Sequence, residues 1–228
     1  MGPVLPAQFT GERLSAVLGL RRPRMYSEED GRAAVRLSRE ALDAFVLRRP
    51  RRPIPLPVLF QEKTGAFVTL NRHPGGDLRG CIGYPSPFFS LEETLIRAAE
   101  GAAEDPRFPP LREEELLGVV VEASLLTPPK LLETARPKDL PGKIQVGRDG
   151  LVAARGRSRG VLLPQVAAEW GWSPEEFLSQ VCVKTGLPPE AWQDGKTLIY
   201  AFQAELFSEV EPRGAVARRA LGMGHASH

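Results

Sequence analysis

The sequence contains few cysteines and no long apolar run, and both absences limit what the protein can be. Its 228 residues include two cysteines, Cys81 and Cys182, which are too few and too far apart for a disulfide framework. No apolar stretch approaches the length of a membrane span. The N-terminus has no charged segment before an apolar one, as a secretory signal would have. We therefore expect a protein of the reducing cytoplasm that has no membrane partner.

Patterns typical of metal and nucleotide sites are also missing. The chain has no paired Cys and His spacing for zinc, no phosphate loop and no dinucleotide fingerprint. It has no serine nucleophile elbow either. The sequence therefore predicts no metal site and no cofactor.

Charge gives little indication of a nucleic-acid partner. The formal net charge is +2, although arginines gather at 21–24, at 48–52 and around 155–159. No RNA-binding signature accompanies these clusters. We interpret them as solvated loops, with an RNA or phosphate surface as the weaker alternative, and do not expect nucleic acid as a partner.

The chain does contain mixed helix and strand patterns of an ordinary globular protein, with 42% hydrophobic and 25% charged residues. Apolar spacing and Ser caps predict two helices, and apolar runs around a Gly-Gly turn predict a hairpin followed by a strand. In chain order these are a helix over 27–47, strands over 65–71 and 78–84, a helix over 90–105 and a strand over 117–129.

The second half of the sequence predicts shorter elements. We expect three short strands within 144–164, helices over 165–171 and 173–186, and a long closing strand over 196–210. Hairpins outnumber crossover units, which favours an α+β fold with a mainly antiparallel sheet. The expected parts are an irregular arm over 1–24, a larger domain over 25–130 plus 195–212, a smaller domain over 131–194, and a flexible tail over 213–228.

The segment "LRGCIG", residues 78–83, is the most distinctive feature of the sequence. Strand alternation predicts one core face and one outer face, and the outer face would carry Arg79, Cys81 and Gly83. A guanidinium group near a thiol favours the reactive thiolate, and glycines such as Gly80 and Gly83 would let a ligand approach it. A buried thiol in a bulged strand is an equally balanced alternative.

A reactive cysteine would need partners elsewhere in the chain. Glu122 interrupts an apolar strand, where a carboxylate needs a partner that Arg79 or Arg107 could supply; the alternative is that Glu122 faces solvent. His73 lies across the hairpin but is a turn residue, which makes it a weak candidate base. Cys182 lies between two valines on a helix and is predicted to fill the core.

Together these residues resemble the AMMECR-one family. The resemblance rests on "LRGCIG", "AAEDPRFPPL", "VEASLLTP", the long segment 150–187 and "AFQAELFSE", and covers about Ser27 to Glu211. It implies two α+β parts, the larger built on an antiparallel sheet and the smaller on short strands plus two helices, with a cleft between them. It also aligns Asp105, Arg107 and Glu122 with the family's motifs. In some bacteria relatives occur beside Memo-like and radical S-adenosylmethionine proteins, which suggests a shared modification pathway.

These observations lead to three hypotheses of function. The first is an enzyme or enzyme subunit that uses Cys81, with Arg79 and Glu122 as catalytic partners. Its ligand would be bound by Gly80, Gly83, Asp105 and Arg107. The second is a non-catalytic module that binds a small molecule or a protein. The oligomeric state stays open, and a homodimer is one alternative. The third and weakest is an RNA-associated protein.

Overall fold

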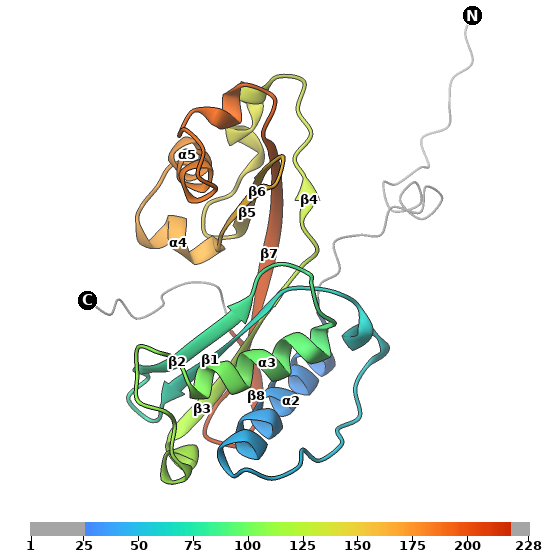
Figure 1. The fold of residues 1–228 in the computed structure, drawn as a ribbon, viewed down its shortest axis with the longest axis vertical. Coiled ribbons are helices and arrows are strands. Elements are labelled where there is room, and N and C mark those ends of the chain that lie inside the picture. Colours follow the sequence, from blue (N-terminus) through green and yellow to red (C-terminus); the bar gives the residue numbers. More distant parts are fainter. Residues whose placement is uncertain (1–25, 220–228) are drawn as a thin grey trace, which may run out of the picture.

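The computed structural model describes residues 26–219, which form an α+β fold around an antiparallel sheet of eight strands (Figure 1). The strand order is β2-β1-β3-β7-β5-β6, and β4 and β8 pair separately with β7. The helices are α2 (Glu28–Val46), α3 (Leu91–Ala103), α4 (Pro164–Glu169) and α5 (Pro174–Lys184). The strands are β1 (Ala66–Arg72), β2 (Leu78–Tyr84), β3 (Val119–Leu126), β4 (Lys130–Leu131), β5 (Asp149–Arg155), β6 (Ser158–Leu162), β7 (Leu198–Glu209) and β8 (Val216–Arg219).

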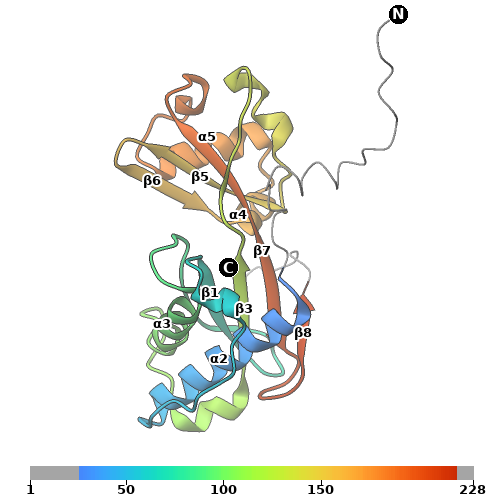
Figure 2. The ribbon, with the colours of Figure 1, turned by 90° about the vertical axis from the view of Figure 1, so that its right-hand side faces the viewer.

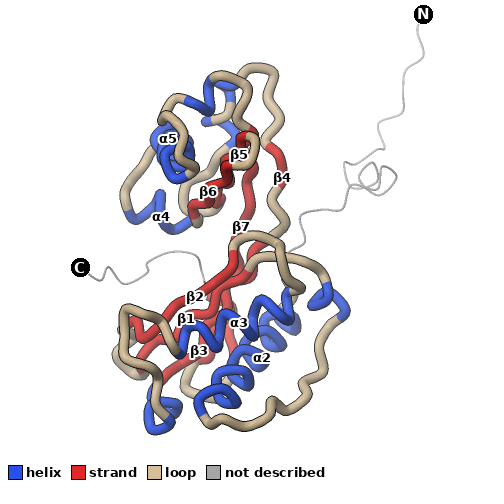
Figure 3. Tube along the Cα trace, in the orientation of Figure 1, coloured by secondary structure: helices blue, strands red, loops and turns tan. Residues whose placement is uncertain are grey.

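Helices α2 and α3 lie side by side across one face of strands β1, β2 and β3 (Figures 1 and 3). Helix α2 begins with the predicted capping box: the Ser27 hydroxyl accepts the Asp30 N–H, and the Asp30 carboxylate accepts the Ser27 N–H. Alternate strand residues, such as Val68 and Val121, are fully buried against the helices. This alternation leaves the intervening side chains on the opposite face of the sheet.

Strand β7 connects this core to a second one (Figure 2). Its first half, residues 198–203, pairs with β5, and its second half, residues 204–209, pairs with β3 and β8. Helix α5 packs on β5 and β6, and the second core contains Phe177, Trp192 and Cys182. Cys182 is completely buried, which confirms its prediction as a core residue.

The α+β class, the mainly antiparallel sheet and the elements of the first half are confirmed. Two expectations were wrong. Segment 144–164 contains two strands and not three, because residues 145–149 close a turn in which Asp149 N–H donates to Gln145 O. Segment 216–219 is strand β8 and not tail, because its backbone pairs with β7.

The division into two domains and the cleft between them stay predictions. The predicted arm over 1–24 lies outside the described residues, as does the end of the predicted tail, residues 220–228. Among residues 26–219, no helix has both the length and the apolar character needed to cross a membrane.

Candidate functional site

The sheet face that neither α2 nor α3 covers carries a line of polar side chains. Cys81 on β2 lies opposite Thr69 on β1, Thr69 lies opposite Glu122 on β3, and Glu122 lies opposite Ser208 on β7. We call these four residues the Cys81 row. Cys81, Thr69 and Glu122 are half-buried, and Ser208 is buried. Neighbouring strands are about 4.8 Å apart, so the row brings a thiol, a hydroxyl and a carboxyl group together.

A β-bulge beside the row moves Arg79 away from Cys81. Leu70 pairs with Gly80 but Asn71 pairs with Leu78, so Arg79 is the extra residue of β2. The buried Arg79 guanidinium donates to the Glu115 carboxylate at 2.8 and 3.0 Å and to the Pro109 carbonyl at 2.9 Å. This ion pair lowers the pKa of Glu115 to about 2. The expectation that Arg79 tunes Cys81 was therefore wrong, since Arg79 is bound to Glu115.

The protein itself occupies the space left by the two glycines of the motif. A Cβ atom on Gly80 would lie 2.2 Å from the Ala102 carbonyl oxygen of α3, so Gly80 allows the helix to approach β2. A Cβ atom on Gly83 would lie 2.2 Å from the ring of Phe67. Their place as ligand-binding residues stays a prediction, and both positions have a packing reason to be glycine.

Asp105 and Arg107 bind the backbone of Cys81 at the outer edge of the sheet. The Cys81 N–H donates to Asp105 Oδ2 at 2.8 Å, and Arg107 Nη2 donates to the Cys81 carbonyl at 3.4 Å. Arg107 also donates to the Asp105 carboxylate at 2.6 and 3.0 Å, which holds the pKa of Asp105 well below its usual range. Since β2 ends the sheet, this pair covers backbone groups that another strand could otherwise bind.

The thiol of Cys81 is held mainly in its protonated form. Burial raises its pKa above the usual value. The Thr69 hydroxyl, which donates to Sγ at 3.4 Å, and the Arg107 guanidinium oppose that shift, while the Asp105 and Glu122 carboxylates add to it. The nearby cation is therefore Arg107, and its effect is smaller than that of burial.

The carboxyl group of Glu122 has no hydrogen bond or ion pair to any residue between 26 and 219. Burial raises the pKa of this group, and within residues 26–219 the charge of Arg219 is what opposes the shift. The predicted partners are occupied, because Arg79 binds Glu115 and Arg107 binds Asp105. The expectation that one of them pairs with Glu122 was wrong.

Apolar side chains border the row on the same face of the sheet. Phe67 lies two residues before Thr69 on β1, and Leu206 lies two residues before Ser208 on β7. Both side chains pack against a third buried cluster, which includes Val152 and Phe202. Val152 belongs to β5 and Phe202 to the first half of β7, so this cluster joins the two parts of the fold. The Cys81 row therefore lies beside their junction.

The family model for AMMECR1 matches residues 35–207. The chain belongs to the AMMECR1 family. Protein PF1979 of Pyrococcus furiosus is 50% identical over 200 residues, which cover 85% of this chain and 95% of PF1979. Protein MJ0810 of Methanocaldococcus jannaschii is 46% identical, with 87% and 99% of the two chains covered. The crystal structure of uncharacterised protein PH0010 from Pyrococcus horikoshii matches with a TM-score of 0.71 and 48% identity, over 85% of this chain and 98% of that one.

The names of these AMMECR1 relatives state no activity. Among residues 26–219, no three His, Cys, Asp or Glu side chains gather as a metal site would require. His73 is exposed in the β1–β2 turn, four residues along the chain from Thr69. Neither Thr69 nor Glu115 was singled out from the sequence. The register of the hairpin could have indicated Thr69, and the acidic segment after "DPRF" could have indicated Glu115.

Proposed function

We propose that the Cys81 row is the binding site of a non-catalytic ligand- or protein-binding module. One observation carries the proposal: the half-buried Glu122 carboxyl group has no hydrogen-bond partner among the described residues. A partly buried carboxyl group without a partner destabilises the folded state. A ligand that donates a hydrogen bond or brings a cation would remove that penalty, and residues retained at a cost in stability are typical of functional sites.

The neighbours of Glu122 define what such a ligand would contain. Thr69 and Cys81 lie on one side of it and Ser208 on the other, while Phe67 and Leu206 provide apolar surface two residues away. An amine, guanidinium or hydroxyl group would bind Glu122, and an adjoining apolar group would pack on Phe67 or Leu206. Both a small molecule and a peptide segment of a partner protein can supply this combination.

An enzyme or enzyme subunit that uses Cys81 is the second candidate. Arg107 opposes part of the rise in the pKa of the thiol, and Glu122 is a nearby carboxyl group, as in sites where ionisable groups serve chemistry. A modification reaction in a pathway with Memo-like and radical S-adenosylmethionine proteins would fit this candidate. Binding is better supported because burial dominates, so a small fraction of the thiol is ionised at neutral pH.

RNA association has weaker support. Part of two basic clusters is engaged within the protein: Arg155 pairs with Asp194, and Arg49 and Arg52 both bind Glu40. Phosphate contacts need guanidinium groups that are free to reach the nucleic acid.

Ligand capture with a matched pair of variants tests the binding proposal. The purified protein is incubated with the small-molecule and peptide fractions of a cell extract, and retained compounds are identified by mass spectrometry. We expect the wild-type protein and Glu113→Gln to retain the same compound, and Glu122→Gln to lose it. Glu113 is an exposed control with no ion pair inside the described chain. Equal retention by all three proteins would contradict the proposal, and a covalent adduct on Cys81 would favour the enzyme.

A further inference from the structure

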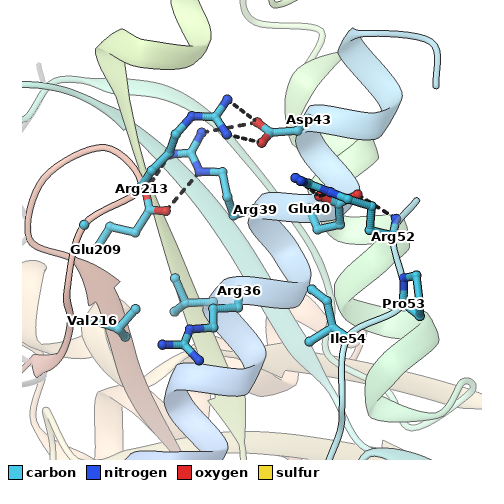
Figure 4. A pocket seen from close by; sticks show the side chains of 12 residues that line it. Arg36, Arg39, Glu40, Asp43, Arg52, Pro53, Ile54, Glu209, Arg213 and Val216 are labelled. Atoms are coloured by element: carbon cyan, nitrogen blue, oxygen red, sulfur yellow. Dashed lines mark hydrogen bonds and ion pairs between the residues drawn. The ribbon is translucent and has the colours of Figure 1, made fainter. Parts of the chain in front are cut away.

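A pocket on the helix side of the sheet has no residue in common with the Cys81 row. It lies between α2, the proline-rich connector over residues 50–57, and the turn between β7 and β8 (Figure 4). Its volume is about 450 Å³, which is within the range of small-molecule sites. The walls combine charged side chains with the apolar surface of Val35, Pro53, Ile54 and Val216.

The acidic side chains of this pocket are already bound by arginine. Each carboxylate makes an ion pair within the pocket: Glu40 with Arg52 at 2.8 Å, Asp43 with Arg213 at 3.1 Å, and Glu209 with Arg39 at 3.0 Å. Because their charge is neutralised, these carboxylates offer little attraction to a cation. The pairs also order the pocket, since Arg39 donates to the carbonyls of Leu116 and Val119 below it.

Arg36 is the exception among the arginines of the pocket. It is exposed on α2, it makes no ion pair with any residue between 26 and 219, and Figure 4 draws it without a dashed line to a carboxylate. The described part of the chain lines the pocket with four arginines and three carboxylates, which leaves one positive charge in excess. A guanidinium group can hold a carboxylate or phosphate through two parallel hydrogen bonds.

We propose that this pocket binds a small organic anion whose carboxylate or phosphate group is held by Arg36. Its apolar part would pack on Ile54 and Val216, on the connector and β8. The head group contributes charge recognition, and the apolar wall distinguishes such a ligand from inorganic ions. This site is independent of the one proposed around Glu122.

Titration with short-chain probes tests this proposal. Hexanoate, hexyl phosphate, hexylammonium and acetate are added to the wild-type protein, and the methyl NMR signals of Val35, Ile54 and Val216 report binding at this pocket alone. We expect at least one of the two hexyl anions to shift these signals, and hexylammonium and acetate to have much weaker effects. The better hexyl anion identifies the head group.

Arg36→Gln and Arg32→Gln form a matched pair for the same titration. Arg32 is exposed on the same helix, does not line the pocket and makes no ion pair within residues 26–219. Arg36→Gln should weaken hexyl anion binding about tenfold or more, while Arg32→Gln should leave it unchanged, and both should melt like the wild type without ligand. The proposal is overturned if neither anion binds the wild-type protein, if hexylammonium binds as tightly, or if Arg36→Gln binds like the wild type.

Discussion

Glu122 is a carboxyl group whose surroundings favour its neutral form. Its pKa is raised by burial, so the folded protein holds this proton more tightly than the unfolded chain does. Such a group stabilises the fold below its ordinary pKa, and this contribution is lost as the pH rises through the raised pKa. At neutral pH the residue is therefore retained at a cost to stability, as expected for a binding group without its ligand.

Replacing Glu122 with Gln should stabilise the protein at pH 7. The amide keeps the size of the side chain and removes the charge, so we expect a gain on the order of 1 kcal/mol in the free energy of unfolding by urea. At pH 4 the gain should shrink, because the wild-type carboxyl group is then largely protonated. A loss of stability at pH 7 would show that Glu122 has a structural partner.

The reactivity of Cys81 should follow its raised pKa. We expect slow alkylation by iodoacetamide at pH 7 and a rate that keeps rising with pH beyond the usual pKa of a cysteine before it levels off, because the thiolate is the reacting form. Arg107→Gln should shift this pH profile upward by removing the nearby cation. A Cys81→Ser variant shows how much of the measured alkylation belongs to Cys81, since its remaining cysteine, Cys182, is fully buried. Fast reaction at neutral pH would favour the thiol enzyme instead.

Among the elements, the packing of β2 against α3 decides where Cys81 lies. The Ala102 carbonyl oxygen of α3 approaches Gly80 so closely that no side chain fits between them. The Asp105 carboxylate, from the loop that follows α3, also accepts the Cys81 N–H next to the bulge at Arg79. The position of the thiol is therefore set by contacts with one helix and one loop.

Gly80→Ala should destabilise the protein by about 1–3 kcal/mol, since the added methyl group meets backbone that cannot move aside easily. Gly118→Ala is the control, because a Cβ atom there has no neighbour within 4 Å. Urea unfolding of the two variants measures the difference. Equal stabilities would mean that α3 can move away from β2 without penalty.

The elements also show what the sequence can and cannot predict. Helix α2, the β1–β2 hairpin and β7 follow from apolar spacing, caps and turn residues, which are local properties of the chain. The bulge is different, because strict alternation places Arg79 beside Cys81. The ion-pair partner of Arg79, Glu115, is 36 residues away along the chain, and no local pattern predicts such a contact. Glu122 was found because a carboxylate in an apolar strand is unusual, although its lack of a partner depends on the fold.

At the scale of the whole molecule, several carboxylates with lowered pKa values connect distant segments. Asp105 binds the edge of β2, Glu40 binds the connector through Arg52, Glu115 binds Arg79, and Asp149 accepts from Gln203 of β7 as well as from its neighbour Arg148. Each carboxylate is charged in the folded protein at a pH where the unfolded chain would protonate it. Their contribution to stability is present above about pH 4, the ordinary carboxyl pKa, and is lost as the pH falls toward the lowered values.

The melting temperature should therefore fall steeply between about pH 4 and pH 2. Glu115→Gln should lower stability at pH 7 and reduce this slope, because it removes one of the carboxylates that titrate there. Glu113→Gln, an exposed control, should change neither quantity. A melting temperature that stays constant down to pH 2 would contradict the arrangement of ion pairs.

A carbon-13 NMR titration of the Glu122 carboxyl group in the ligand-free protein tests the proposed binding site most directly. The Glu122→Gln variant identifies its signal. A pKa above that of an ordinary glutamate is the predicted result, because the structure shows a half-buried carboxyl group without a hydrogen-bond partner among residues 26–219. An ordinary or lowered pKa would mean that Glu122 is solvated or already paired, and would contradict the proposed binding site.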